Sequence, residues 1–258
     1  MSTSGASTEI VTGARYVEQI TASESDRLAR TGFRDLVLRV APPAGVLFDF
    51  GSGTGMDARF YAERGFTVGA YDVDPQMCEF CAEYCRDLID AGRITLTRSS
   101  YRDFLTNGTP GGGVDLVTSN FAPLNLVADL QELFAKFHKL TRPKGKVLAS
   151  VLSPYFLGDL KYRWWWRNAL RLWRTGHYPV QGAQAPIVRR RLDDFARQSA
   201  PYFTLERVFR GVSSSSARDL AGVNLHGTAL NCALRLSTCR FMFLLFERRD
   251  DAGSLSVS

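Results

Sequence analysis

The chain has 258 residues, a hydrophobic fraction of 45% and a formal net charge of +6. This length suits one large domain, with or without an insertion, and the hydrophobic fraction is sufficient for a sizeable core. The longest apolar run, 241–246, is far shorter than the ~18 residues that a transmembrane helix requires, and the pattern of the first residues predicts no secretory signal. We therefore expect a cytoplasmic protein.

Short apolar runs alternate with helical patterns over most of the chain. Residues 1–12 are small and polar and are expected to form a disordered tail. A helix capped by Thr21 or Ser23 should follow and end near Val40. Beyond it we predict strands at 46–50, 67–71, 94–97, 114–118 and 146–152, and helices at 57–64, 75–90 and 129–140. This alternation is typical of an α/β domain whose mostly parallel sheet is covered on both faces.

The alternation stops at residues 153–200, which are basic and rich in tryptophan. Nine Lys or Arg stand against three Asp between Tyr155 and Ala200, an excess equal to the net charge of the whole chain. All four tryptophans lie in the same stretch. Two further strands are predicted at 204–209 and 240–246. We therefore expect a single domain over 13–258 into which 153–200 is inserted as a cap.

A glycine loop follows the first predicted strand and precedes a helix. The loop consists of Gly51, Ser52, Gly53, Thr54 and Gly55. Its glycines allow a sharp turn and let a ligand approach the backbone, at the edge where open α/β sheets bind ligands. Asp49 lies two residues before the loop, where a carboxylate can meet a cationic amine. Asp72 ends the next strand, where a carboxylate can accept both hydroxyls of a ribose. The pattern predicts a site for a ribose-containing cofactor.

This arrangement resembles motif I and the following acidic position of class I S-adenosylmethionine (SAM)-dependent methyltransferases. The next residues are similar to that family's strand-end pattern and read Tyr71-Asp72-Val73-Asp74-Pro75-Gln76-Met77. Residues 98–104 take the place of the family's adenine-contacting segment, with Ser100 where the family often has Asp. Residues 115–121 look like the fourth-strand motif. The resemblance is good over about 44–152, weaker over 201–248 and absent in the cap.

The resemblance implies a Rossmann-like sheet of seven strands with an antiparallel last strand. It implies SAM as the cofactor and S-adenosylhomocysteine as the product, with no metal. It assigns cofactor binding to Asp49, Gly51, Ser52, Gly53, Gly55, Asp72, Val73, Met77, Ser100, Tyr101, Asn120 and Phe121. The implied activity is methylation of an oxygen or nitrogen on a small, fairly apolar or aromatic acceptor, as in natural-product biosynthesis.

Two alternatives stay open: a methyltransferase that acts on a carrier-bound or membrane-associated lipid acceptor, and a Rossmann oxidoreductase that binds NAD(P) or FAD. Residues 53–58 fit the fingerprint G-x-G-x-x-A, and Asp72 follows Gly53 by 19 residues, near the ~20 expected for an acid on the ribose. That fingerprint requires neither Gly51 nor Asp49, and both favour the methyltransferase.

Two sets of polar residues near the loop are interpreted as structural. Cys78, Cys81 and Cys85 share one face of a predicted helix, and a zinc site would need a fourth ligand from a remote segment. We expect them to be core residues. Asp57 is interpreted as a first-turn acid favoured by the helix dipole.

The candidates for a general base are His226 and His177, which both lie outside the repeated α/β pattern. Transfer without a base stays open, because an ionised acceptor or a neutral amine needs none. Residues 120–123 read Asn-Phe-Ala-Pro and lack the Asn-Pro-Pro-Tyr pattern of enzymes that methylate nucleic-acid bases or glutamine. We therefore expect a small-molecule acceptor and no nucleic acid.

The tryptophan-rich segment predicts an amphipathic helix over 159–174. One face carries Tyr162, Trp166, Leu170 and Trp173, and another carries Arg163, Arg167, Arg171 and Arg174. We expect the segment to cap the acceptor site and to bury Trp166 and Trp173 near the transferred methyl group. Contact of the arginines with an anionic substrate, a carrier protein or a membrane surface stays open.

Overall fold

Eight strands form the main sheet in the part of the chain that the structure describes. This computed structural model describes residues 23–107, 113–180, 186–210, 222–224 and 239–250. In sheet order the strands are β3 (Ile94–Arg98), β2 (Thr67–Asp72), β1 (Val46–Phe50), β4 (Val114–Ser119), β5 (Thr141–Leu152), β10 (Phe241–Arg248), β8 (Phe203–Arg210) and β9 (Gly222–Asn224). The first five are parallel, and β10 is antiparallel to both β5 and β8. The predicted Rossmann-like sheet with its reversed last strand is confirmed, and β9 extends it at the edge.

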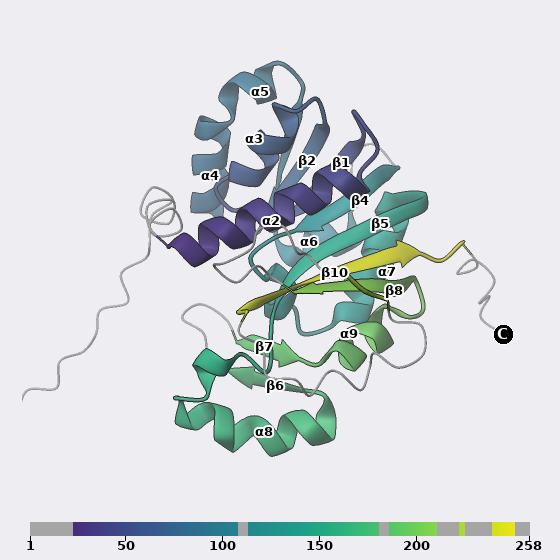
Figure 1. The fold of residues 1–258 in the computed structure, drawn as a ribbon. Coiled ribbons are helices and arrows are strands. Elements are labelled where there is room, and N and C mark those ends of the chain that lie inside the picture. The colour runs from purple at the N-terminus through teal and green to yellow at the C-terminus, as the bar shows by residue number, and fades with distance from the viewer. Residues whose placement is uncertain (1–22, 108–112, 181–185, 211–221, 225–238, 251–258) are drawn as a thin grey trace, which may run out of the picture.

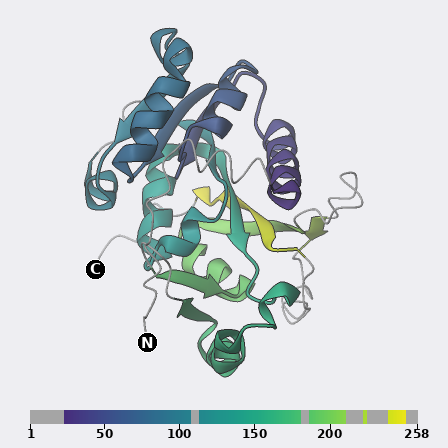
Figure 2. The ribbon, with the colours of Figure 1, turned by 90° about the vertical axis from the view of Figure 1, so that its left-hand side faces the viewer.

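Helices lie on both sides of this sheet (Figures 1 and 2). One face is covered by α2 (Glu24–Val40), α3 (Met56–Ala62), α4 (Pro75–Tyr84) and α5 (Arg86–Asp90). The other is covered by α6 (Tyr101–Thr106), α7 (Leu130–Leu140) and α9 (Leu192–Ser199). Each layer buries its own apolar cluster against the sheet, with Phe33 and Tyr61 in one and Phe134 and Phe195 in the other. Among the described helices, none has the length and apolar character needed to cross a bilayer.

The predicted boundaries agree with the structure where local signals are strong. Ser23 caps α2 by accepting a hydrogen bond from the backbone N–H of Asp26. The single helix predicted over 75–90 is wrong, because the backbone leaves helical geometry at Cys85 and separates α4 from α5. Strand β5 begins at Thr141, five residues before its predicted start.

The three cysteines of this region are buried, as predicted, and two of them set the packing of the glycine loop. Cys81 and Cys85 belong to the apolar cluster beneath α3. Gly55 has φ +79°, and a Cβ there would lie 2.5 Å from Cys81 Sγ and 2.9 Å from Cys85 Sγ. Glycine is required here for both reasons: the left-handed backbone and the close approach of the two sulfurs.

The basic segment leaves the sheet after β5 and returns through α9. It contains η2 (Leu157–Asp159), α8 (Arg163–Thr175) and an antiparallel pair, β6 (His177–Val180) and β7 (Ile187–Arg190). In Figure 1 these elements lie below the main sheet, at the opposite end from α3 and α5. Helix α9 packs in the core through Phe195, so the described residues outside the α/β layers are 153–180 and 186–190 rather than the full 153–200. We call residues 153–180 and 186–190 the excursion.

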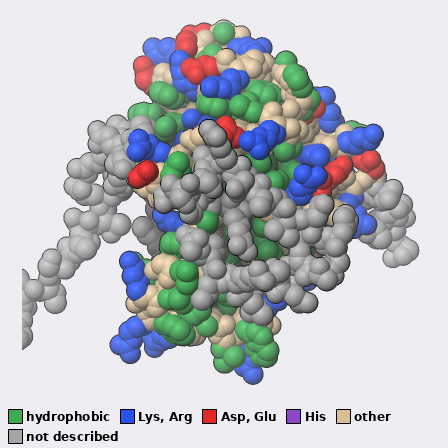
Figure 3. Space-filling model, in the orientation of Figure 1, with side chains coloured by type: hydrophobic (Ala, Val, Ile, Leu, Met, Phe, Trp, Pro, Cys, Tyr) green, Lys and Arg blue, Asp and Glu red, His purple; other side chains and the backbone are tan. Residues whose placement is uncertain are grey.

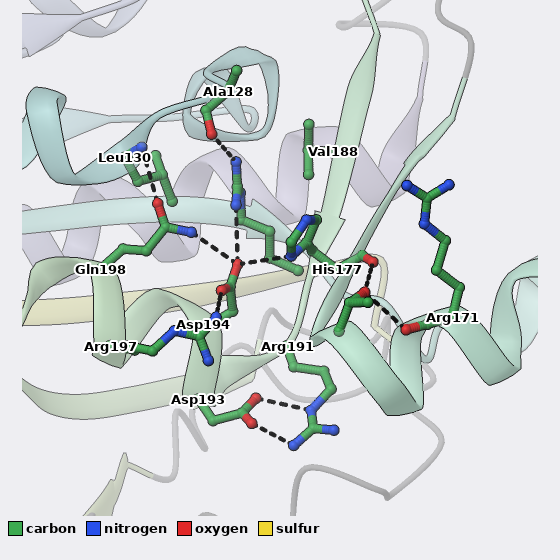
Figure 4. A network of polar contacts seen from close by, with 12 residues as sticks. Ala128, Leu130, Arg171, His177, Val188, Arg191, Asp193, Asp194, Arg197 and Gln198 are labelled. Atoms are coloured by element: carbon green, nitrogen blue, oxygen red, sulfur yellow. Dashed lines mark hydrogen bonds and ion pairs between the residues drawn. The ribbon is translucent and has the colours of Figure 1, made fainter.

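A buried carboxylate joins the excursion to the core (Figure 4). Asp194, on α9, is fully buried and accepts hydrogen bonds from Arg190 at 2.9 Å and Gln198 at 3.0 Å. Arg190, at the end of β7, also donates to the backbone carbonyls of Val127 and Ala128 at 2.8 and 2.7 Å. A buried arginine needs several acceptors, because its charge cannot be removed by deprotonation, and here both terminal nitrogens of Arg190 have them.

We predict that Asp194→Ala lowers the free energy of unfolding by about 3–5 kcal/mol, because it leaves the buried Arg190 guanidinium without its counter-ion. The neighbouring Asp193, whose side chain is 34% exposed and pairs with Arg191, provides the matched control. Asp193→Ala should cost less than about 1 kcal/mol. Urea unfolding followed by circular dichroism measures both, and equal losses in the two variants would contradict this role for Asp194.

Candidate cofactor-binding site

The parallel register brings the ends of three strands together. Asp49 on β1 lies opposite Ala70 of β2 and Thr118 of β4. The carboxyl ends of β1, β2 and β4 therefore share one edge, and the glycine loop, Asp72 and Asn120 leave the sheet there. This is the edge at which open α/β sheets bind ligands.

Backbone hydrogen bonds hold the glycine loop against the end of β2. The N–H groups of Gly51 and Ser52 both donate to the carbonyl of Tyr71, at 2.8 and 2.9 Å. The N–H of Gly53 donates to Asp72 Oδ2 at 2.7 Å, while Asp72 Oδ1 accepts from the N–H of Asp74 at 2.9 Å. A Cβ added to Gly53 would meet no atom within 4 Å, so the loop has open space on that side. The loop and Asp72 thus form one preformed unit.

Asp49 is a buried carboxylate with one oxygen unpaired. Its side chain is 2% exposed, and its Oδ1 accepts a hydrogen bond from Thr118 Oγ1 at 2.8 Å, whereas Oδ2 has no partner within the described residues. Burial raises the pKa of Asp49, and the nearby charge of Asp57 adds to the effect, bringing the pKa to about 7. A cation placed next to Asp49 would favour its ionised form.

Asp57 does more than the first-turn role predicted for it. It is buried and accepts hydrogen bonds from Arg30 and Arg34 of α2, both at 2.6 Å, and from Asn120 Nδ2 at 3.0 Å. Burial alone would raise the pKa of Asp57, but the two arginine charges outweigh it and hold the pKa below its ordinary value. The sequence signal for this contact was the spacing of Arg30 and Arg34, which places both on the α2 face that also carries Phe33 and Val37.

The turn after β4 packs directly on the glycine loop. Phe121 and Ala122 both have left-handed backbones, with φ +61° and +69°, although neither is glycine. Asn120 Oδ1 accepts from the N–H of Phe121 at 2.9 Å, and a Cβ on Gly51 would lie 2.5 Å from Pro123. Strained non-glycine backbone of this kind costs about 1–3 kcal/mol per residue and is concentrated at functional sites.

The remaining predicted cofactor residues lie beyond β2 and β3. Val73 is 58% exposed directly after Asp72, and Met77 lies in the first turn of α4. The hydroxyl of Ser100 caps α6, because it accepts from the N–H of Asp103 at 3.1 Å. The hydroxyl of Tyr101 is buried without a hydrogen-bond partner in the described structure.

Of the two candidate bases, the structure describes only His177. His226 lies outside the described residues. His177 begins β6, and its Nδ1 is buried, lies 3.8 Å from Asp194 Oδ2 and makes no hydrogen bond within the described part of the chain. Figure 4 shows the imidazole beside the Asp194 carboxylate. A carboxylate in that position can orient an imidazole ring.

The expectation that Trp166 and Trp173 are buried beneath a cap is wrong. Their side chains are 63% and 65% exposed, whereas Trp165 and Leu172 form the buried side of α8. The indole N–H of Trp165 donates to the carbonyl of Pro154 at 3.1 Å and fixes this orientation. The helical period therefore grouped the aromatic residues correctly, but their face points away from the protein.

The comparisons with known proteins identify the domain that contains this site. Residues 47–145 match the family model described as "Methyltransferase domain". A curated relative, a malonyl-[acyl-carrier protein] O-methyltransferase from Serratia marcescens, is 29% identical over 135 residues. That match covers 52% of this chain and 48% of the relative, so the chain spans about half the length of the relative it matches.

Solved structures share the fold over nearly the whole chain. A SAM-dependent methyltransferase from Mesorhizobium loti has a TM-score of 0.59 at 18% identity and covers 86% of this chain and 100% of its own. A 1,6-didemethyltoxoflavin-N1-methyltransferase from Burkholderia thailandensis, solved with its acceptor and S-adenosylhomocysteine, has a TM-score of 0.58 at 15% identity and covers 92% and 87%. At these identities the likeness concerns the fold.

The polar groups at the strand ends fit the cofactor of this family. Three buried polar atoms lack partners at this edge within the described structure: Asp49 Oδ2, Ser52 Oγ and Ser119 Oγ. A cationic amine can use the carboxylate, the hydroxyls can donate to a carboxylate, and Asp72 can accept from a ribose diol. The open side of Gly53 leaves the backbone accessible to the ligand. Residues 47–145 therefore match a methyltransferase domain, and the unpaired polar groups at the strand ends fit S-adenosylmethionine.

Proposed function

We propose that this protein transfers a methyl group from SAM to oxygen or nitrogen of a small, fairly apolar or aromatic acceptor. The observation that carries the proposal is the glycine loop bonded to Asp72 beside the unpaired carboxylate oxygen of Asp49. The acceptor class is supported by the aromatic turn that packs on this loop, where the rings of Phe121 and Phe241 meet edge to face at 5.4 Å. The cytoplasm is the proposed compartment, consistent with the free thiols of Cys78, Cys81 and Cys85.

In this account the protein contributes positioning rather than bond activation. SAM supplies a methyl group already activated on a sulfonium. Asp49 and Asp72 would hold the amino acid and ribose ends, while the strained turn at 120–123 would fix the wall beside the methyl group. The excursion would exclude water from the acceptor, since its strand β7 is held close to this turn by Asn125, two residues further along the chain, whose Nδ2 donates to the Val188 carbonyl at 2.7 Å.

An acceptor carried on a protein is the second candidate. It is favoured by the relative from Serratia marcescens, whose name gives a malonyl group on acyl-carrier protein as its substrate. The excess of arginines in the excursion would suit an acidic carrier. The two candidates differ in whether the free small molecule is methylated.

Incubation with SAM and a panel of phenols, carboxylic acids and amines tests the proposal. We expect release of S-adenosylhomocysteine with at least one free acceptor. In Asp72→Ala the SAM concentration for half-maximal rate should rise about 10–100-fold, as for a lost hydrogen bond to a charged group. The exposed Asp90→Ala is the charge control. Turnover only with carrier-bound acyl groups would favour the second candidate, and tight NAD binding without SAM binding would contradict both.

We predict that SAM affinity rises with pH between about 5.5 and 7. The fold raises the pKa of Asp49 from its ordinary value of 3.8 to about 7, so the carboxyl is protonated below pH 7 and must lose its proton to pair with a cation. Calorimetry in buffers of different ionisation enthalpy should detect proton release at pH 6.

The control is Asp49→Asn, whose amide has no such proton to lose, so its SAM affinity should be flat across that range. The same substitution should make the free energy of unfolding less dependent on pH, because the raised pKa of Asp49 gives stability that is present below pH 4 and lost as the pH rises through about 7. A SAM affinity that is equally pH-dependent in both proteins would show that Asp49 is not the titrating partner.

The base is tested by single-turnover rates with SAM affinity measured separately. If a histidine accepts a hydroxyl proton, His226→Ala or His177→Ala should slow transfer by about 10²–10⁴-fold at unchanged SAM affinity. His138→Ala, on α7 and bonded to the carbonyl of Arg249 at 3.2 Å, is the control. Losses below about threefold in both variants would assign catalysis to alignment alone.

A further inference from the structure

The outer face of α8 combines apolar and basic side chains in two adjoining stripes. The apolar stripe consists of Tyr162, Trp166, Leu170 and Trp173, which are 44%, 63%, 60% and 65% exposed. The basic stripe consists of Arg163, Arg167, Arg171 and Arg174. We call the two stripes together the α8 outer face. Figure 3 shows green and blue side chains together at the lower end of the molecule, where Figure 1 places α8.

The packing of α8 fixes this outward orientation. Trp165 and Leu172 are buried, the indole N–H of Trp165 donates to the Pro154 carbonyl, and the ring of Trp164 approaches that of Tyr178 with centroids 6.3 Å apart. The helix ends at Gly176, whose φ is +78°, and the chain continues directly into β6. Because the buried side is occupied, the aromatic stripe cannot turn inward without losing these contacts. The exposure is a property of the fold.

The charge on this face is uncompensated. None of its four arginines, nor the adjacent Lys161, makes an ion pair within the described residues. The one carboxylate in the sequence 157–175, Asp159, is buried and pairs with Arg189 at 3.1 Å. Elsewhere on the molecule many surface arginines have carboxylate partners, as Arg59 does in Asp87 at 2.7 Å. The α8 outer face therefore presents positive charge with no counter-ion among the described residues.

We propose that the α8 outer face binds an anionic lipid membrane surface. Tryptophan and tyrosine favour the headgroup region of a bilayer, where their rings are apolar and their N–H or O–H groups stay hydrated. Arginines beside them can donate paired hydrogen bonds to lipid phosphates. A helix about 20 Å long with these two stripes suits an in-plane interfacial position. An acidic protein would match the charge but would also need an apolar groove for two indole rings. This inference concerns binding and does not rest on the proposed methyl transfer.

Flotation with vesicles tests the proposal directly. The full-length protein should bind vesicles of phosphatidylcholine and phosphatidylglycerol, bind phosphatidylcholine alone far less, and dissociate as salt rises. Arg167→Gln/Arg171→Gln should weaken partitioning about 25-fold, at roughly 1 kcal/mol per basic residue. Trp166→Ser/Trp173→Ser should weaken it at least about tenfold.

The control variants remove positive charge or an apolar side chain from exposed positions outside the α8 outer face. Arg39→Gln/Lys139→Gln removes the same charge from exposed positions on α2 and α7, and Leu38→Ser removes an exposed leucine from α2. Both should bind anionic vesicles within about twofold of the wild type, since neither site belongs to the α8 outer face. Circular dichroism and SAM affinity verify that each variant is folded, and the lipid and salt dependence of the wild type tests the proposal without any variant.

Three results would overturn the proposal that the α8 outer face binds an anionic membrane surface. The first is no difference between anionic and neutral vesicles for the wild type. The second is self-association that Trp166→Ser/Trp173→Ser abolishes, which would assign the face to a second copy of the chain. The third is binding to an acidic carrier protein, lost in Arg167→Gln/Arg171→Gln, with no binding to vesicles.

Discussion

The buried carboxylate of Asp57 is the interaction on which the rest of the site depends. It accepts from Arg30 and Arg34 of α2 and from Asn120 after β4, and Asp57 itself lies in the first turn of α3, directly after the glycine loop. Segments far apart in the sequence are thereby fixed around one charge, and loss of any partner would leave buried charge poorly compensated. After burial, the same charge is the largest cause of the raised pKa of Asp49. The charge of Asp57 thus both holds these segments together and raises the pKa of Asp49 at the cofactor site.

The strands, the glycine loop and Asp72 could be predicted because their signals are local. Apolar runs, capping residues and glycines act within a few positions of themselves. The contact between Arg30 and Asp57 could not be predicted from the sequence, because it joins residues 27 positions apart that only the packed fold brings together. The same limit applies to α8: periodicity shows which side chains share a face, whereas burial of Trp165 and Leu172 decides which face turns inward. The short strands β6 and β7 carry too few residues for a clear alternation.

The predicted cofactor residues and the excursion occupy different parts of the chain. The α/β layers carry the predicted cofactor residues, and Asn125, shortly after the strained turn at Phe121 and Ala122, contacts the excursion. Buried polar contacts of Asn125 and Arg190 fasten the excursion there. The inner side of the excursion is therefore fastened next to the strained turn, while its outer side carries the aromatic and basic residues of α8. If both proposals hold, one inserted segment contributes to acceptor selection on one side and to membrane attachment on the other.

A crystal structure with S-adenosylhomocysteine tests the central claim most directly. The account predicts the nucleoside against the loop Gly51–Gly55, both ribose hydroxyls within hydrogen-bond distance of Asp72, and the amino group on the side of the Asp49 carboxylate. The sulfur should face the turn at 120–123, because that turn packs on the loop where Gly51 meets Pro123. Electron density for the ligand at any other edge of the sheet, or a ribose that does not contact Asp72, would contradict the account.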